Sequence, residues 1–338
     1  VGNHPIPDEN SINAADEIIS LVKKCKEKDL LIVLISGGGS ALLCKPRVNL
    51  KDTQKMTDLL LRCGANINEI NTIRKHLSHI KGGQLAKYAK CRVVSFVISD
   101  IIGDPLDFIA SGPTYPDSTT FKDSKYILKK YEIWEKTPKS IQETIKKGIN
   151  KEIKETPKPQ DPIFKKVDNI IVANNTLACM SAEKKAKELG YKTMLLTTKL
   201  EGEAKDVANF LIEKSINYNN FKDKMIFIAG GETTVTLKGD GKGGRNQEMT
   251  LATVKNILSN NIVFCSFGTD GIDGNSDAAG AISDKYTFNR AKSKNMNPDF
   301  YLKNNNSYEF FYNLDDLFIT GPTGTNVMDL QIIVKYNE

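Results

Sequence analysis

Residues 225–248 read MIFIAGGETTVTLKGDGKGGRNQE. The stretch begins with the apolar run Met225–Ile228, which predicts a buried strand, and continues through a glycine-rich loop to a helix predicted to start near Asn246. Glycines permit positive φ and a close approach of the backbone to a ligand, so main-chain N–H groups can converge on an anion there. The positive end of the helix and the guanidinium of Arg245 would favour the same charge. This stretch therefore predicts an α/β fold with an anion-binding loop.

Short β-branched runs alternate with longer helical segments along the rest of the chain, which is typical of parallel α/β architecture. The predicted strands are Leu30–Ile35, Arg92–Ile98, Asn169–Ala173, Lys192–Thr197, Met225–Ile228, Val263–Phe267 and Leu330–Lys335. The predicted helices are Ser11–Lys26, Leu50–Cys63, Glu69–Ile80, Thr176–Leu189, Ala204–Ile216 and Gln247–Leu258. The Pro- and Lys-rich segment Gly148–Val167 and the polar segment Asn217–Lys224 are predicted connectors.

Composition places the chain among ordinary globular proteins. Its 338 residues suggest two domains, at about 150 residues each. The net charge of +6 comes from dispersed lysines without interleaved aromatics, which favours a solvated basic surface over a nucleic-acid site.

The longest apolar run, Leu30–Ile35, is far short of a membrane span, and no signal peptide is visible. The six cysteines form no CxxC pair, which favours reduced thiols and a cytoplasmic location. Because the chain opens with Val1 rather than methionine, an upstream part is expected.

Four predicted strands run into loops rich in Gly, Ser and Asp. These loops are SGGGS (Ser36–Ser40), SDIIGD (Ser99–Asp104), AGGET (Ala229–Thr233) and GTDGIDG (Gly268–Gly274). In open α/β sheets the carboxyl ends of the strands form the ligand crevice, so we expect these loops to bind a ligand. Each loop by itself could equally be an ordinary turn.

Several motifs narrow the chemistry. Gly239, Gly241 and Gly244 match GxGxxG, a weak dinucleotide signal, but no Walker A motif is present. Asp270, Asp273 and Asp277 do not have EF-hand spacing, yet a carboxylate in such a loop could hold Mg²⁺ or accept a proton. Asp100 and Asp104 could also hold Mg²⁺ or accept a proton, and each could instead cap a turn.

Two histidines and several cations lie close together in the segment 71–83. His76 and His79 have helical spacing that could suit a metal, but a surface or helix-end role is favoured because cations surround them. The cations Arg74, Lys75 and Lys81 could serve a phosphate, or could form the basic outer face of an amphipathic helix. Cations, backbone donors and carboxylates in loops together favour phosphoryl transfer over acyl transfer.

The motifs closely resemble those of the class II glycerate kinases, which carry a C-terminal MOFRL domain. The resemblance covers essentially the whole chain and rests on HPIPDE (His4–Glu9), LISGGGSALL (Leu34–Leu43), NTIRKHLSHIKGG (Asn71–Gly83), SDIIGDPLDFIASGPT (Ser99–Thr114), GGETTVTLKGDGKGGRNQE (Gly230–Glu248), GTDGIDG (Gly268–Gly274) and TGPTGTNVMDL (Thr320–Leu330).

This resemblance implies a fold and an activity. The fold would be two three-layer α/β/α domains with mostly parallel sheets and an active site in the cleft between them. The glycerate-kinase N-terminal-type region would span residues 1–205, with Asn174–Leu200 as a βαβ unit beside it, and the MOFRL domain residues 221–338. The activity would be ATP- and Mg²⁺-dependent phosphorylation of D-glycerate to 2-phosphoglycerate. Family members begin with a further segment carrying a GxGKA-type loop with an active-site lysine, and nothing like it occurs here.

The resemblance also suggests roles for individual residues. Arg245 would stabilise the transferring phosphoryl group or grip the glycerate carboxylate, and its replacement by alanine is predicted to leave the fold intact. Asp270 would be the base or a Mg²⁺ ligand, and Asp100 the second carboxylate for Mg²⁺. The predicted nucleotide- or glycerate-binding residues are Ser36, Gly37, Gly38, Gly39, Ser40, Lys75, Glu232, Gly243, Gly244 and Asn326.

Two alternatives stay open at this level. One is a hydroxypyruvate reductase that uses a nicotinamide cofactor, and the other is a catalytically inactive anion-binding relative. The expected partner is the small substrate, without nucleic acid or membrane, and self-association into a homo-oligomer is left open.

Overall fold

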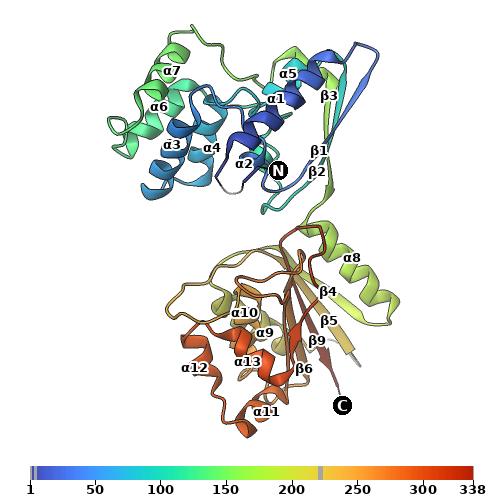
Figure 1. Cartoon of the computed structure of the whole chain (residues 1–338). Helices are drawn as coiled ribbons and strands as arrows, with labels where there is room; N and C mark the ends of the chain where they lie inside the picture. The colour runs from blue at the N-terminus through green and yellow to red at the C-terminus, as the bar shows by residue number, and fades with distance from the viewer. Residues whose placement is uncertain (1, 4–5, 220–223, 338) are drawn as a thin grey trace. The chain divides into compact units, whose positions relative to one another are not determined.

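The computed structural model describes residues 2–3, 6–219 and 224–337, and these residues form two compact units. The first unit comprises residues 1–98 and 104–172, and the second comprises residues 99–103 and 173–338. The predicted organisation into two α/β domains is confirmed (Figure 1). The units divide at residues 172–173, whereas the first family region was predicted to extend to residue 205.

The first unit contains a three-stranded sheet in the order β1–β2–β3. Its strands are β1 (Leu30–Ile35), β2 (Arg92–Ile98) and β3 (Val167–Ala173), and β1 runs parallel to β2. Its helices are α1 (Glu9–Lys24), α2 (Gly39–Leu42), α3 (Leu50–Arg62), α4 (Ile67–His76), α5 (Gln84–Tyr88), α6 (Phe121–Lys130) and α7 (Lys139–Ile149), with 3₁₀ turns η1 (Ile109–Ser111) and η2 (Pro162–Lys166).

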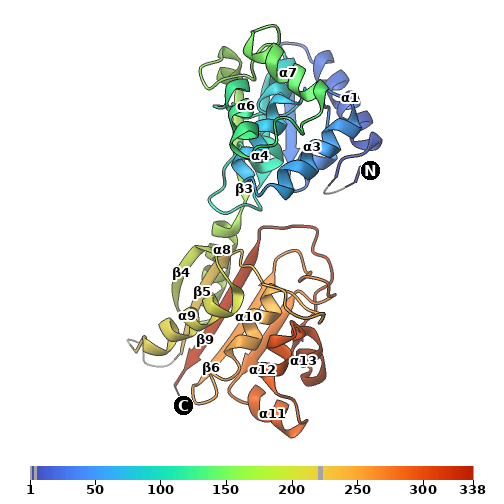
Figure 2. The same ribbon diagram turned by 90° about the vertical axis from the view of Figure 1, so that its left-hand side faces the viewer.

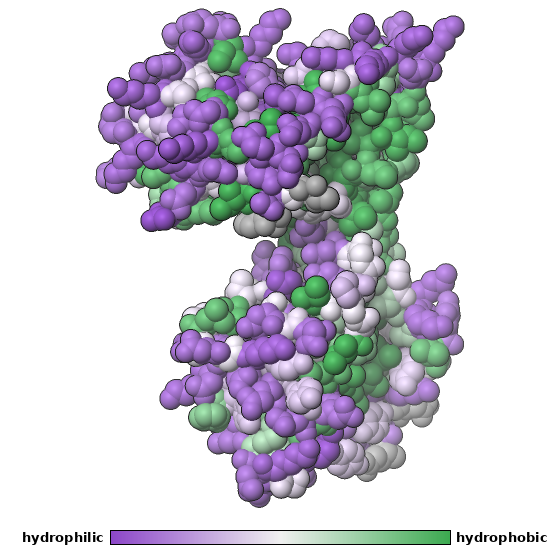
Figure 3. Space-filling view, viewed as in Figure 1, coloured by the Kyte–Doolittle hydropathy of each residue, from purple (hydrophilic) through white to green (hydrophobic). Residues whose placement is uncertain are grey.

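The apolar residues of this unit form two cores. One lies between α1, α5 and the inner side of β1, where Ala15 and Leu85 meet Val33. The other joins α3, α4, α6 and α7 without a strand. The opposite face of β1 leaves Leu34 79% exposed, and Figure 3 shows a broad apolar area over β1–β3. Among the described residues, helices therefore cover this sheet on one face, which differs from the three layers expected.

The second unit contains a six-stranded sheet in the order β4–β5–β9–β6–β7–β8. Its strands are β4 (Lys192–Leu200), β5 (Lys224–Gly231), β6 (Ile262–Gly268), β7 (Gly280–Asp284), β8 (Leu317–Phe318) and β9 (Asp329–Tyr336). Among the described residues the strand pairs of this sheet are antiparallel except β4 with β5, so the expectation of a mostly parallel sheet is wrong here. The reason is that β9 lies between β5 and β6 and runs opposite to both. Strands β7 and β8, which were not predicted, then extend the sheet beyond β6, each antiparallel to the strand before it.

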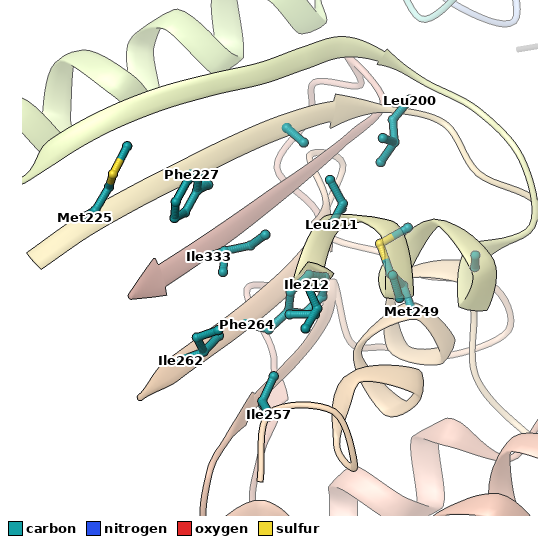
Figure 4. Close-up of a cluster of buried hydrophobic side chains, with 13 residues drawn as sticks. Leu200, Leu211, Ile212, Met225, Phe227, Met249, Ile257, Ile262, Phe264 and Ile333 are labelled. Atoms are coloured by element: carbon teal, nitrogen blue, oxygen red, sulfur yellow. The ribbon is translucent and has the colours of Figure 1, made fainter. Parts of the chain in front are cut away.

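Helices pack on both faces of this second sheet, giving the three layers predicted. Helix α8 (Asn175–Glu188) packs through Cys179 against Ile228 of β5. Helices α9 (Ala204–Asn217) and α10 (Arg245–Thr253) cover the other face, in front of the strands in Figure 2. Side chains from both layers fill that core, among them Leu211, Phe227 and Phe264 (Figure 4), and each such burial stabilises the fold by about 1.5–3 kcal/mol. The remaining helices are α11 (Thr287–Ser293), α12 (Pro298–Lys303) and α13 (Ser307–Leu314).

Some predicted elements lie elsewhere in the structure. Segment 174–200 is not a βαβ unit beside the first region, because β4 pairs with β5 and α8 packs on that sheet. The predicted connector 148–167 lies within the first unit, where it leads from α7 to β3. Part of the predicted break at 217–224 lies outside the described residues, as do His4 and Pro5. Within the described ranges, no helix has the length and apolar content needed to cross a membrane.

Candidate active site

Three strands of the second unit bring their loops to one edge of the sheet. Strand β5 ends at Gly231 and β6 ends at Gly268, and both residues pair with Asp329, the first residue of β9. Because β9 is antiparallel to its neighbours, its start lies at the edge where the other two strands end. Asp329 thus lies beside the starts of two loops, the glycine-rich loop after β5 and the GTDGIDG loop after β6.

Arg245, the first residue of α10, is held by two carboxylates at this edge. Its Nε and Nη2 donate to Asp329 Oδ2 and Oδ1 at 2.6 and 3.0 Å, and its Nη1 donates to Glu232 Oε1 at 2.7 Å. The guanidinium of Arg245, predicted to bind a ligand through two N–H groups at once, thus makes its two parallel hydrogen bonds to the carboxylate of Asp329. A guanidinium carries five N–H donors, so part of its donor capacity is left for a ligand.

Burial and charge set the protonation of this group. Burial lowers the pKa of Arg245, but Asp329 and Glu232 outweigh that effect and raise it above its usual value. Burial raises the pKa of Glu232, with Arg245 opposing and the charges of Asp329 and Asp100 adding to the rise. Asp100 lies in the 99–103 segment of the second unit, so the structure brings it within electrostatic reach of Glu232. The site is thus a permanent cation enclosed by carboxylates.

Asp273 occupies the start of α10. Its carboxylate accepts from the backbone N–H groups of Asn246 (3.1 Å) and Gln247 (2.9 Å), and from both of their side-chain amides. Burial raises the pKa of Asp273 to about 6, while these hydrogen bonds oppose the rise. The expectation that the helix start would hold a ligand anion is therefore corrected, because the protein's own carboxylate binds there.

A pocket of about 890 Å³ opens beside Arg245 in the second unit. This volume suits a ligand of the size of a cofactor. Asp270 lines it and accepts from the Ile272 N–H at 3.1 Å, and Asn326 lines it and accepts from the Met328 N–H at 2.9 Å. The predicted site residues in its lining are Glu232, Gly243, Gly244, Arg245, Asp270 and Asn326.

Two glycines near this pocket, one in the loop after β6 and one in the segment before β9, differ in how closely other backbone atoms approach them. Both Gly271 (φ +86°) and Gly324 (φ +76°) are left-handed, but a Cβ at Gly271 would overlap the carbonyl oxygen of Gly321, whereas a Cβ at Gly324 would meet no atom within 4 Å. We expect Gly324→Ala to cost about 1 kcal/mol and Gly271→Ala roughly 2 kcal/mol more, since the crowding atom is backbone. Urea unfolding of the two variants measures this, and equal losses would contradict the crowding.

The other predicted residues lie in the first unit. Gly38 (φ 77°) precedes the four-residue helix α2, and Ser40 Oγ lies 2.7 Å from Ser111 Oγ. Lys75 is almost fully buried, with its Nζ 3.2 Å from an Asp107 oxygen and 3.7 Å from an Asp117 oxygen. The structure thus separates the predicted residues into two groups, with Ser36–Ser40 and Lys75 in one unit and the remainder in the other.

The histidines do not form a metal site. His76 is the last residue of α4, as the helix-end alternative predicted, but it is buried rather than at the surface. It lies between the Thr72 carbonyl oxygen at 2.8 Å and Glu155 Oε2 at 3.0 Å. His79 lies beyond the end of α4, so the two are not on one helix. Among the described residues, no group of three or more His, Cys, Asp or Glu side chains could hold a metal ion. Asp100 and Asp270 as Mg²⁺ ligands stay a prediction.

Lys81 supports the turn that follows the SGGGS loop. Its Nζ is buried and donates to the carbonyl oxygens of Ser40 (2.6 Å) and Leu43 (2.9 Å), at the end of α2. Burial lowers the pKa of Lys81 from 10.5 to about 8. A half-buried glycine-rich loop is thus anchored by a buried ammonium group.

The lowered pKa of Lys81 predicts how stability changes with pH. Between pH 8 and 10.5 the unfolded chain binds more protons at this residue than the folded chain does, so stability rises as pH increases. We expect a gain on the order of 2–3 kcal/mol from this residue, which Lys81→Met should lack. Urea unfolding of both proteins from pH 7 to 10 tests this, and parallel pH profiles would refute it.

Sequence reasoning missed two residues that organise the site. Asp329 is not evident from the sequence, because its place at this edge depends on β9 being antiparallel to β5 and β6. Asp273 was considered only as one aspartate among several, since spacing does not reveal which carboxylate reaches α10. The clearest available signal was that Asp329 directly precedes an apolar strand within the motif TGPTGTNVMDL.

Comparisons with known proteins place this site in a family. A model described as the MOFRL family matches residues 225–329, and a domain of unknown function, DUF4147, matches residues 1–146. The glycerate 2-kinase of Pyrococcus horikoshii is 45% identical over 98% of this chain and 76% of the relative. The D-glycerate 2-kinase of Thermotoga maritima is 42% identical over 97% of this chain and 78% of the relative. The crystal structure of glycerate kinase from Thermotoga maritima superposes with a TM-score of 0.91, at 41% identity, over 99% of this chain and 80% of that structure.

Proposed function

The chain belongs to the glycerate kinase family, and on that premise we propose that it transfers a phosphoryl group from ATP to D-glycerate, giving 2-phosphoglycerate. The observation that carries the proposal is Arg245, a cation fixed by Asp329 and Glu232 at the wall of a large pocket. Phosphoryl transfer depends mainly on positioning and on cations that face the transferring group. A guanidinium that is already oriented needs no reorganisation when charge develops.

Each predicted residue then has a defined task. The free N–H groups of Arg245 would bind the transferring phosphoryl group or the glycerate carboxylate. Asp270 would accept the proton of the attacking hydroxyl, since its carboxylate lines the same pocket. Ser36–Ser40 and Lys75 would contact oxygens of the nucleotide or of glycerate.

We infer that carboxylates of this region would hold Mg²⁺. A magnesium ion uses one or two protein carboxylates and completes its coordination with phosphate oxygens and water, so Asp270 and Asp100 suffice as ligands. When bound, Mg²⁺ would neutralise charge on the phosphate oxygens.

The proposal is tested by ADP release from the complete gene product supplied with D-glycerate, ATP and Mg²⁺. Immediate conversion of the product by enolase would establish 2-phosphoglycerate, and conversion only after phosphoglycerate mutase is added would indicate the 3-phosphate. No ADP release from folded protein would overturn the kinase and favour an inactive anion-binding relative.

The nicotinamide-dependent reductase receives less support from the site. The glycines that match GxGxxG lead into α10, whose first backbone N–H groups are bound by Asp273. A dinucleotide pyrophosphate needs such N–H groups at the helix start. NADH binding without any effect of ATP would favour the reductase instead.

All six cysteines are free, which supports a location in the reducing cytoplasm.

A further inference from the structure

The first unit contains a partly open cavity of about 120 Å³ lined by residues of α2, α3 and α4. Its lining is mainly apolar and includes Ala41, Met56, Leu60, Ile73 and Leu77. Most of these side chains are buried, so the cavity belongs to the interior of the unit. A space of this kind is suited to an apolar group.

Two cations interrupt the apolar lining without a carboxylate to balance them. Lys81 is 4% exposed, and the hydrogen bonds of its Nζ with described residues go to the two carbonyl oxygens at the end of α2. Arg74 makes no side-chain hydrogen bond or ion pair with any residue that the structure describes. Burial lowers the pKa of Arg74, and the one titratable neighbour that opposes this effect is the Cys44 thiol. Lys81 is buried and Arg74 is half-buried, and a cation withdrawn from water without an anion is costly, so this pair would gain from an anionic ligand.

The hydroxyl groups around the cavity are already used inside the protein. Ser40 Oγ lies 2.7 Å from Ser111 Oγ, and Ser78 Oγ accepts from the Ile80 and Lys81 N–H groups. Thr53 and Thr57 donate to carbonyl oxygens one turn earlier in α3. The polar groups left for a ligand are therefore the cations, which favours a ligand with one charged end and an apolar body over a polyhydroxy acid.

We propose that this cavity binds a short-chain aliphatic monocarboxylate, with its carboxylate on Arg74 and Lys81 and its alkyl chain against Met56, Leu60 and Ile73. A guanidinium matches a carboxylate in a bidentate manner, and the apolar wall supplies the hydrophobic contribution. The site is distinct from the pocket beside Arg245, and it stands whether or not the proposed kinase activity is correct.

The cavity contacts the loop predicted to bind oxygens of the substrates. Ala41 of α2 lines it, and Lys81 connects the cavity to the Ser40 and Leu43 carbonyl groups. A carboxylate bound beside Lys81 would therefore hold α2, and the SGGGS turn before it, in one position.

Binding is tested with butyrate as the probe and its neutral isostere butyramide as the control ligand, at constant ionic strength. We expect butyrate to raise the melting temperature of the wild-type protein in a saturable manner, and butyramide to leave it unchanged. Arg74→Met should weaken butyrate binding at least tenfold. Arg62→Met is the matched control, because Arg62 is exposed on α3 and bonded to Asp58, and it should bind butyrate as the wild type does.

Three results would overturn the proposal. Equal responses to butyrate and butyramide would mean that charge is not recognised, and unchanged butyrate binding by Arg74→Met would place the ligand elsewhere. Displacement of butyrate by D-glycerate, lost in Arg74→Met, would make the cavity a glycerate site instead. Crystals of the wild-type protein soaked in butyrate give an independent measurement: electron density for the alkyl chain should lie between Met56 and Ile73, and its absence at saturating ligand would refute the site.

Discussion

Replacing Arg245 by alanine should lower turnover by about a hundredfold or more and destabilise the second unit by about 3 kcal/mol. The first effect follows from losing a cation that is already oriented toward the pocket. The second follows because Asp329 is 1% exposed and would lose both of its hydrogen bonds from Arg245, leaving a buried charge without its partner. The sequence-based expectation that the fold stays intact remains a prediction, and the structure adds to it an expected loss of stability.

A second variant separates the two effects. In Arg245→Met/Asp329→Asn the buried charge is removed together with its partner, so most of the lost stability should return while turnover stays low. Arg245→Lys keeps the charge but loses the planar fork, and it should restore less than a tenth of the activity. Steady-state ADP release and urea unfolding measure both quantities. Near-normal turnover in the double variant would refute the role of Arg245.

Asp273→Ala should produce a comparable loss of stability, about 3 kcal/mol, because four buried donors at the start of α10 lose their acceptor. Part of the penalty is offset, since burial already makes the ionised carboxylate costly. Turnover should fall as well, because Arg245 is the first residue of the same helix.

Two neighbouring substitutions control for this prediction. Asp273→Asn keeps one acceptor oxygen in the same place and should cost about 1 kcal/mol. Asp277 lies in the same region but its side chain is 69% exposed, and Asp277→Ala should change stability by less than about 0.5 kcal/mol. Thermal and urea unfolding of the three variants give the ranking. A loss in Asp277→Ala as large as that in Asp273→Ala would contradict the cap.

The local elements of the fold were largely predictable from the chain. Strands β1 and β2 have the predicted bounds, since a β-branched run closed by Gly or Ser and Asp is a short-range signal. Helix α4 ends at His76, four residues before the predicted end, because the chain turns there to pair Ser78 with Pro46. Strands β7 and β8 were not predicted, since they are short and are stabilised by pairing with neighbours distant in sequence.

The candidate site was predictable in its residue types and only partly in its arrangement. The glycine-rich loop, Arg245 and Asp270 line one pocket as the strand-end argument suggested. The partners of Arg245 were not predictable, because they depend on strand direction. A parallel sheet would have placed the start of β9 away from the ends of β5 and β6.

The sequence by itself determined the α/β class, the two-domain organisation, the family and the loops that carry the polar residues, because periodicity and glycine spacing act over short distances along the chain. Only the tertiary structure decided that Asp329 and Glu232 hold Arg245, that Asp273 rather than Asp270 or Asp277 caps α10, and that Arg74 and Lys81 share a cavity. The physical reason is that a carboxylate or a cation acquires its role from burial and from the partner it reaches. Both are set by how strands pair and helices pack across many residues.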